Sequence, residues 1–409
     1  MQLKWRTLWL LSLAELLAMT LWFSMSAVAP QLRAELSLTT TAESSLTMSV
    51  QAGFVFGALI IAVLNLADRF PAHHLISICA LLGAAFNLAI AIVDLPLAAV
   101  LVLRFLTGAS LAGVYPPGMK VLASWFTSGR GLAIGILVGA LSIGNAGPHL
   151  LNAFPVFGGS DGLPPWRTIL IAVSVQAAIG GILAALFVRS GPHLPQRSAF
   201  DWRYAGKVFT DPPLRFANFG YLGHMWELYA MWTWAPMFLL SAWGAAGAGN
   251  TVGRHAGFAA IAAGAIGCVL AGALADQMGR TLIASASLCA SGMCCLIVGP
   301  LFGAPAALTF ICVIWGAAVV ADSAQFSTAI SELCDQRYVG TALTMQTCSG
   351  FLLTSVSIWL LPELREFTAA RGLANHEFAL LALGPVFGVW SMWRLRRLPE
   401  AVKMAGGRR

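Results

Sequence analysis

Five ionisable side chains stand inside long apolar runs of this sequence: Glu15, Arg104, His224, Glu227 and Asp322. A charge in the hydrocarbon of a bilayer is expensive, so a chain that retains one there generally uses it for recognition or proton transfer. Carboxylates and a histidine can bind and release protons, while an arginine can pair with them or hold an anion. These residues predict proton-coupled chemistry or recognition of a polar solute.

Two of the carboxylates belong to matching stripes. Residues 15–22 and 227–234 agree at five of eight positions at an offset of 212. Each segment carries a Glu, a Met and a Trp at i, i+4 and i+7, which is the spacing of one helix face. We expect the stripes to face each other across a central cavity, with Trp22 and Trp234 among its aromatics. The alternative is that each glutamate is a packing element held by a hydrogen bond or an ion pair.

The second stripe has polar and aromatic neighbours. His224 precedes Glu227 by three positions. This is the spacing of two metal ligands on one helix, but no further ligand is evident and we predict no metal site. A His–Glu pair that titrates near neutral pH is the prediction instead. Four aromatics of this segment, Trp226, Tyr229, Trp232 and Trp234, either form an amphipathic wall for a planar or cationic solute or are packing aromatics.

Two further stripes complete the candidate site. Asp322, Gln325 and Phe326 share one helix face and offer a carboxylate, an amide and a ring to a polar ligand. Arg104 and Tyr115 fall at i and i+11 on another face. We expect Arg104 to snorkel, to pair with Asp322 or with the first-stripe glutamate, or to bind an anion.

The elements that position these side chains follow from composition. The 409 residues are 58% hydrophobic and only 10% charged. Soluble chains carry about 25% charged residues. With a mean hydropathy of +0.78, soluble and disordered classes are excluded. No P-loop, GxSxG, HExxH or dinucleotide motif is present, so we expect no enzyme and no cofactor. The eight cysteines form neither a metal-type pair nor a disulfide framework.

Apolar runs divide the chain into about 12 spans of about 20 residues each. We predict an all-α polytopic membrane protein with two six-helix bundles at 1–188 and 213–398, a cytoplasmic linker at 189–212 and a basic tail at 399–409. The predicted helices are 7–30, 44–67, 74–93, 97–121, 131–154, 166–188, 213–241, 254–275, 281–300, 305–329, 339–361 and 376–397.

The basic residues predict the orientation. With the N-terminus inside, 18 of the 24 lysines and arginines fall in cytoplasmic segments and five in outer ones, with Arg104 in a span. This asymmetry follows the positive-inside rule, and an odd number of spans would scramble it. Both termini are therefore expected in the cytoplasm.

Two loops carry related motifs. Residues 272–280 read G-A-L-A-D-Q-M-G-R, and Leu66-Ala67-Asp68-Arg69 is a degenerate copy in which Asn65 replaces the leading glycine and Pro-Ala-His-His replaces Gly-Arg. Together with Arg104-x-x-x-Gly108 and twelve spans, these motifs resemble those of the major facilitator superfamily over essentially the whole chain. The resemblance implies that helices 1, 4, 7 and 10 line a central cavity.

The motif has a physical reading of its own. An Asp at a helix end, followed a few residues later by an Arg, can form charge-assisted hydrogen bonds to the end of a neighbouring helix. Such a latch would hold one face of the transporter closed. The predicted gating residues are Asp68, Arg69, Asp276, Gly279 and Arg280, with His73 or His74 as alternative partners in the degenerate copy; a simple solvated turn is the alternative to a latch.

A narrower resemblance covers residues 115–133. Here Y-P-P-G, W-F and G-R-G-L-A are similar to the bacterial branch often labelled nitrate/nitrite or cyanate-type porters, although the Gly/Asn-rich nitrate signature is not intact. Gly135, Gly139, Gly144 and Gly147-Pro148 partly resemble the Gly-Pro motif of proton-linked exporters. Close helix packing through small residues is the other reading.

We therefore expect a secondary transporter of the bacterial inner membrane that moves a small solute by alternating access, coupled to protons by symport or antiport. A porter of small organic or inorganic anions and a multidrug-type exporter are alternatives. A non-transporting receptor is disfavoured, because no signalling domain is evident. The expected partners are the solute, protons and lipid, with no nucleic acid, and the protein is expected to be a monomer.

Overall fold

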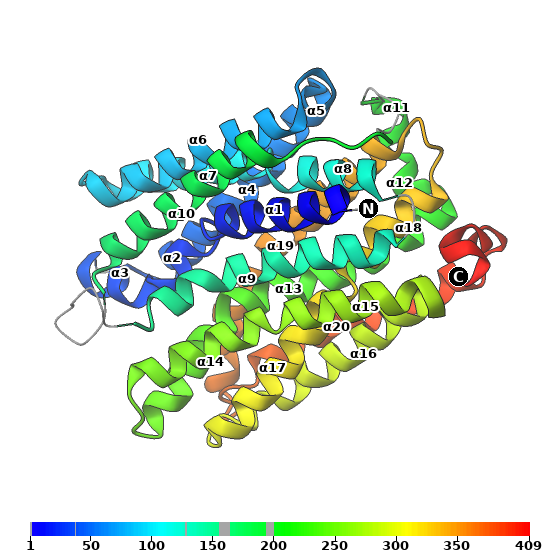
Figure 1. Ribbon diagram of the computed structural model, residues 1–409. Coiled ribbons are helices and arrows are strands. Elements are labelled where there is room, and N and C mark those ends of the chain that lie inside the picture. The colour runs from blue at the N-terminus through cyan, green and yellow to red at the C-terminus, as the bar shows by residue number, and fades with distance from the viewer. Residues whose placement is uncertain (1, 37, 127–128, 155–163, 194–199) are drawn as a thin grey trace.

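The structure is a computed structural model that describes residues 2–36, 38–126, 129–154, 164–193 and 200–409. Every regular element in these ranges is a helix. The long helices run along one axis, and both chain ends lie at the same end of the molecule (Figure 1). This end is called the terminal end below, and the opposite one the distal end.

The first half of the chain supplies ten helices. Proline opens or precedes several of them, as expected for a residue whose missing N–H is not needed in a first turn. They are α1 (Gln2–Met19), α2 (Ser24–Ala27), α3 (Ala29–Leu36), α4 (Thr40–Val63), α5 (Leu66–Arg69), α6 (Ala72–Ile92), α7 (Leu97–Leu111), α8 (Tyr115–Trp125), α9 (Arg130–Leu151) and α10 (Trp166–Phe187).

The second half repeats this pattern. Its elements are α11 (Trp202–Ala205), α12 (Lys207–Thr210), α13 (Pro212–Ala245), α14 (Asn250–Ala262), α15 (Gly264–Met278), α16 (Arg280–Ile297), α17 (Pro305–Ala321), α18 (Ser323–Leu333), α19 (Val339–Ala369), η2 (Glu377–Ala382), α20 (Leu383–Arg396) and η3 (Pro399–Gly407).

Ten spans in the described part of the chain are long and apolar enough to cross a membrane. The sequence predicts twelve. The two predicted spans that fall short are α1, which carries Lys4, Arg6 and Glu15, and α13, which is rich in polar, aromatic and glycine residues. These two helices also hold the matching glutamates, Glu15 and Glu227.

Several predicted helices are broken in mid-course. The predicted helix 7–30 ends at Met19 and resumes only at Ser24. The predicted helix 97–121 is interrupted after Leu111, because Pro116 and Pro117 open α8 and have no N–H to continue a helix. The predicted helix 305–329 is divided at Asp322, which lies between α17 and α18.

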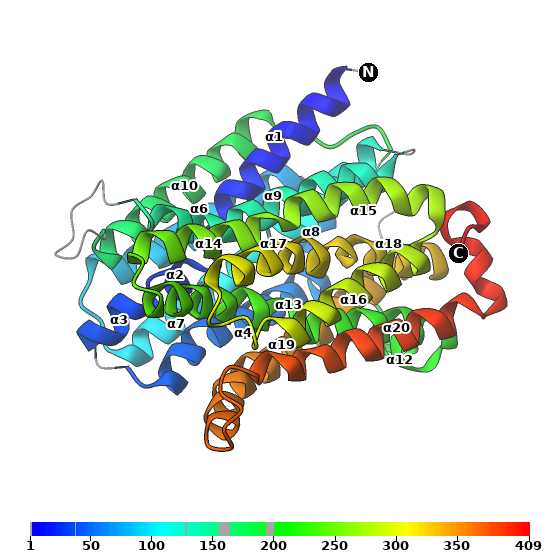
Figure 2. The ribbon, with the colours of Figure 1, turned by 90° about the horizontal axis from the view of Figure 1, so that it is seen from below.

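Other boundaries differ at the terminal end. The predicted linker 189–212 contains α11 and α12, while 194–199 lies outside the described residues. The predicted tail 399–409 folds as η3 and packs against α15 and α18 (Figure 2). The C-terminal segment therefore folds back onto two helices of the second half.

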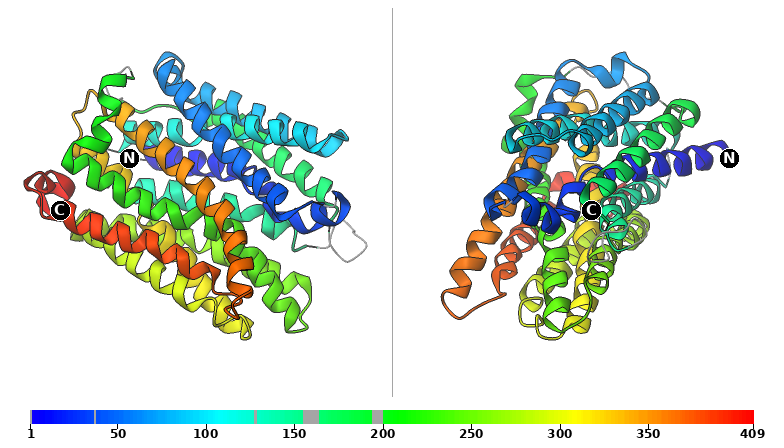
Figure 3. Two further views of the ribbon diagram at one scale, coloured as in Figure 1. Left: turned by 180° about the vertical axis from the view of Figure 1, so that it is seen from behind. Right: turned by 90° about the vertical axis from the view of Figure 1, so that its left-hand side faces the viewer.

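The two halves of the chain lie side by side (Figures 1 and 3). Within the first half α4 packs on α7 and α6 packs on α10; within the second half α13 packs on α14, α19 and α20. The halves meet along two seams, one between α4 and α19 and one between α9 and the successive helices α14 and α15. These seams are where the halves must separate if they move relative to each other.

Candidate functional site

Glu227 is fully buried in α13 and accepts three hydrogen bonds. Ser291 Oγ donates over 3.0 Å, Cys295 Sγ over 3.1 Å and Trp315 Nε1 over 2.5 Å. The donors come from α16 and α17, which belong to the same half of the chain as α13. The carboxylate is therefore surrounded by partners from its own half, as expected of a buried acceptor that is satisfied.

Glu15, its counterpart in α1, has a different environment. Its exposed fraction is 0%, and neither carboxylate oxygen has a hydrogen-bond partner among the described residues. It packs against Gly118 of α8, where a Cβ would overlap Oε1. The two glutamates thus do not face each other as expected, because each points between helices of its own half; only Glu227 meets donors there.

His224 pairs with Asp322 rather than with Glu227. Nδ1 of His224 lies 2.8 Å from Oδ1 of Asp322, and both side chains are buried. Asp322 can reach α13 because it sits at the break between α17 and α18. Phe326, one turn on, lies 5.6 Å from the His224 ring. The structure therefore brings three predicted residues together as one histidine–carboxylate pair beside an aromatic ring.

Arg104 holds the broken end of the first span. Its guanidinium donates to the carbonyls of Leu21 and Trp22, at 3.1 and 2.6 Å, and to Ser24 Oγ at 3.2 Å. A fourth contact reaches Asn87 Oδ1 at 3.4 Å. In the described part of the chain Arg104 forms no ion pair with a carboxylate, since unwound carbonyls beyond α1 take its donors.

The predicted cavity aromatics separate into three environments. Trp22 belongs to a cluster of rings at the seam between α4 and α19, whereas Trp226 donates to the Leu380 carbonyl over 3.4 Å and Trp234 to the Ile358 carbonyl over 3.1 Å. Tyr115 opens α8 and is half-buried. The packing alternative describes Trp226 and Trp234, since they donate to backbone carbonyls of η2 and α19 respectively.

The ring cluster joins the two halves in the middle of the molecule. Trp22 lies 5.6 Å from Tyr229 and 5.4 Å from Phe351, and Phe54 lies 4.5 Å from Phe351. All are buried. The aromatic cluster is defined as Trp22, Phe23, Phe54, Tyr229, Trp232 and Phe351. It leaves the halves in contact at this level.

At the terminal end Arg280 pairs with neighbours of the second loop motif, residues 272–280. Its Nε and Nη2 donate to the two oxygens of Glu332 over 2.8 and 2.7 Å, and Nη1 donates to Gln325 over 3.2 Å. Asp276 receives a longer bond of 3.4 Å. Gly279, between α15 and α16, has a φ of +100°, a conformation that favours glycine.

Asp276 also faces the other half of the chain. A Cβ on Gly131, in the first turn of α9, would lie 2.8 Å from either carboxylate oxygen of Asp276. An acid at a helix N-terminus interacts favourably with the partial positive charge there. The second motif thus brings a carboxylate from α15 to the start of α9.

The first motif uses a different partner from those expected. Asp68 pairs with Lys120 of α8, and Lys120 also donates to the Ala67 carbonyl over 2.8 Å. Arg69 is exposed. Among the described residues the ion pair of Asp68 is with Lys120, and not with His73 or His74.

Small residues line the terminal half of the seam between α9 and α15. A Cβ on Gly131 would meet the Gly272 carbonyl, one on Gly135 the Cys268 carbonyl and one on Gly139 the backbone of Ala265. Glycines spaced by four residues let two helices approach closely. The close-packing reading predicted for Gly135 and Gly139 describes this seam.

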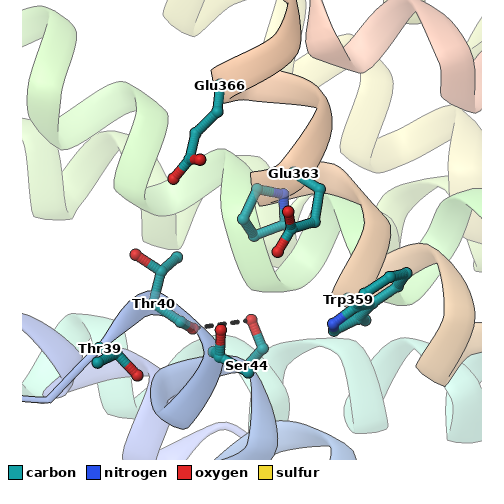
Figure 4. A pocket seen from close by; sticks show the side chains of 8 residues that line it. Thr39, Thr40, Ser44, Trp359, Glu363 and Glu366 are labelled. Carbon is teal, nitrogen blue, oxygen red and sulfur yellow. Dashed lines mark hydrogen bonds between the residues drawn. The ribbon is translucent and has the colours of Figure 1, made fainter.

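A cleft of about 190 Å³ opens at the distal end between α4 and α19 (Figure 4). Thr39, Thr40 and Ser44 line one side, and Trp359, Glu363 and Glu366 line the other. None of these was singled out in the sequence, because only the fold brings 39–44 next to 359–366.

The sequence does not predict that Glu332, Lys120 and the three donors to Glu227 are partners of the candidate residues. Each lies far from its partner along the chain, on a different helix. The one available signal is the charge of Lys120 and Glu332 near span ends. In the described residues no group of three His, Cys, Asp or Glu side chains could hold a metal ion.

Long helices in two associated halves, buried ionisable pairs and paired loop motifs define a multi-pass membrane transporter. Residues 11–358 match the family model of the Major Facilitator Superfamily, and the chain belongs to this superfamily. It is therefore a secondary transporter of a solute, and not an enzyme.

Solved structures show the same fold at low sequence identity. The xylose transporter XylE from E. coli, in a partially occluded inward-open conformation, is 13% identical, with 98% of each chain covered and a TM-score of 0.75. A bacterial homolog of the human lysosomal transporter Spinster is 16% identical (96% of each chain, TM-score 0.68). The nucleoside transporter NupG is 14% identical (95% of this chain, 99% of that one, TM-score 0.67). No curated protein matches the sequence.

Proposed function

We propose that this transporter is proton-coupled and moves a small polar solute by alternating access between two six-helix bundles. Twelve spans are proposed, with α1 and α13 added to the ten apolar ones, because both lie among the other long helices and pack against them. The shared position of the chain ends and the basic bias of that side support a cytoplasmic terminal end in the inner membrane of a bacterium.

One observation carries the coupling proposal: Glu15 is fully buried, and the described part of the chain places no hydrogen-bond donor at either carboxylate oxygen. A buried carboxylate with neither a donor nor a cation is strongly disfavoured in its charged form. A proton removes the charge, so Glu15 can be closed into the protein when protonated and needs access to water when it is not. Its protonation is thereby tied to the conformation of the transporter.

The His224–Asp322 pair supports the same proposal from the second half. The pair can share one proton or hold two, and Nε2 of His224 has no partner in the described ranges. Glu227 is assigned a structural role, since its three donors stabilise the carboxylate where it stands.

Buried amides favour a polar solute. Gln51, Asn218 and Gln346 are buried, and neither the oxygen nor the nitrogen of any of these side chains has a partner among the residues that the structure describes. An amide both donates and accepts, which suits hydroxyl and amide groups of a solute. Some solved structures that this chain resembles are proton:sugar symporters, which favours a neutral hydroxylated solute as the first class to screen.

The experiment compares Glu15→Gln with Glu227→Gln in proteoliposomes. A thermal-shift screen of sugars, nucleosides, amino acids, organic anions and hydrophobic cations first supplies the solute. Glu15→Gln is expected to abolish accumulation driven by a pH gradient while retaining counterflow, because exchange needs no net proton movement. Glu227→Gln is expected to keep coupling and to lose stability. Coupling that survives Glu15→Gln would show that the assignment is wrong.

A second candidate, transport of a small anion, is favoured by one observation. Arg254 is buried in α14, a helix that packs on α9 of the other half, and among the described residues no carboxylate lies within salt-bridge distance of it. The likeness of 115–133 to nitrate, nitrite and cyanate porters and the exporter reading both stay predictions.

A further inference from the structure

The seam between α9 and α14–α15 changes character along its length. Its terminal half consists of glycine contacts, in which Gly135 faces Cys268 and Gly139 faces Ala265. Toward the distal end α9 carries Ser142, Asn145 and His149, which share one face at i, i+3 and i+7. The small-residue seam thus becomes a polar one.

Arg254 enters this polar half from the opposite helix. It precedes Ala265 by three helical turns, so both lie on the face of α14–α15 that meets α9. Its neighbours Gly253 and Gly257 contact α13 instead. The ring of His255 lies 5.7 Å from that of Phe154, so the segment that follows α9 also contacts α14 at the distal end.

The polar groups of this region lack partners in the part of the chain that the structure describes. Arg254 is 6% exposed, its Nη1 has no hydrogen-bond partner, and no ion pair to it exists among the described residues. His149 Nε2 and both amide atoms of Asn145 are likewise buried without partners there.

These groups share one chemical requirement. A buried guanidinium without an anion is costly, and buried donors without acceptors add to the cost. A guanidinium presents two parallel N–H groups to two oxygens of a carboxylate or phosphate. A ring N–H of His149 and the Asn145 amide can donate to the same oxygens.

We propose that Arg254, His149 and Asn145 form a binding site for an oxyanion, a carboxylate or a lipid phosphate, between α9 and α14. The occupant contacts both halves of the chain at the distal, outer end. It therefore stabilises the state in which that end is closed, an effect that rests on the alternating access proposed above. The binding site itself stands on geometry alone.

The test measures thermal unfolding of the purified full-length protein, first freed of lipid in detergent. Sodium acetate replaces sodium chloride at constant ionic strength. We expect the unfolding midpoint to rise with the logarithm of the acetate concentration above the dissociation constant, by about 3 °C at the highest concentration used. Arg254→Gln should abolish it and Arg254→Lys should weaken it, while Arg33→Gln, at an exposed arginine of α3, should respond as the wild type does.

A second arm identifies the source of the oxyanion. Without acetate, micelles containing phosphatidylglycerol are compared with micelles of phosphatidylcholine. A rise specific to phosphatidylglycerol that requires Arg254 and removes the acetate response assigns the site to a lipid head group. A response to acetate alone assigns it to a free carboxylate.

Two further variants keep the result decisive. If Arg254→Gln does not fold, His149→Phe retains a ring without the donor and should weaken acetate binding about tenfold. Glu15→Gln should leave the acetate response intact, which separates this site from the coupling proposal. An equal response in Arg254→Gln and wild type, or no rise of the midpoint in either arm, overturns the site.

Discussion

Arg280 and Glu332 form a two-point ion pair, with Nε and Nη2 of the arginine 2.8 and 2.7 Å from the two carboxylate oxygens. The same carboxylate accepts the backbone N–H of Ala405 over 3.1 Å. Arg408 of the folded tail donates to the Asp276 carbonyl over 3.0 Å. Glu332 thus connects the second loop motif with the tail, and Asp276 is bonded through its side chain to Arg280 and through its carbonyl to Arg408.

Glu332→Gln should destabilise this end of the protein. Arg280 is buried, and Glu332 accepts two of its hydrogen bonds. Replacing this carboxylate with a neutral amide leaves the buried guanidinium less well paired, at a cost of about 2–3 kcal/mol. The midpoint of thermal unfolding in detergent should fall by several degrees. The matched control is Asp335→Asn, in an exposed pair with Arg337, which should leave the midpoint unchanged.

The control pair stays charged during this measurement. Arg337 lowers the pKa of Asp335 to about 2. Any stability that the pair contributes is fully present above the ordinary Asp pKa and is lost as pH falls through about 2. A buffer near neutral pH therefore does not alter it. Equal midpoints for Glu332→Gln and wild type would contradict the stabilising role of Glu332 between Arg280 and the tail.

Gly135→Val should open the terminal end. The added side chain would collide with the Cys268 carbonyl and force α9 from α15. Cys268 is buried in that seam, so its labelling by a permeant maleimide, located by peptide mass spectrometry, should become at least about tenfold faster. Gly206→Ala, where a Cβ meets nothing within 4 Å, is the control. Unchanged Cys268 labelling would argue against the seam as a moving contact.

Arg104→Lys should be almost as damaging as Arg104→Gln. Four acceptors from α1–α2 and α6 converge on a planar guanidinium, and a single ammonium cannot reach them all. We expect a loss of about 2–4 kcal/mol in stability, measured by thermal unfolding. Rescue by lysine would instead show that charge alone is needed at this position.

Phe351→Ala should weaken the closure between the halves. The ring contacts Trp22, Phe54 and Tyr229, and its removal leaves a buried space that admits water. Proteoliposomes containing a pH-sensitive dye should show faster proton leakage than the wild type. Phe310→Ala, at a surface ring that is 66% exposed, should leave leakage unchanged. Tight vesicles with Phe351→Ala would mean that closure lies elsewhere.

Much of the helix pattern was predictable because a span is a local property. Runs of apolar residues place the spans to within several residues, and the similarity of 15–22 to 227–234 identifies the matching glutamates. The break after Met19 was not predictable, because it depends on Arg104, far along the chain in α7, to satisfy the released carbonyls.

The pairings of the candidate site were predicted less well. Periodicity shows which residues share a face, but not which helix that face meets. His224 was matched with Glu227 on its own helix, whereas the fold brings Asp322 to it. Asp68 likewise meets Lys120, whose position in α8 follows from the packing of whole helices.

The divided seam of α9 gives the two ends of the transporter unlike means of opening. Where glycine faces backbone, the two helices can separate with little change in side-chain hydrogen bonding. Where Arg254, His149 and Asn145 converge, separation must exchange one set of polar partners for another. With the oxyanion site proposed above, separation of the distal end would depend on the anion that occupies the site, whereas separation of the terminal end would depend on helix packing.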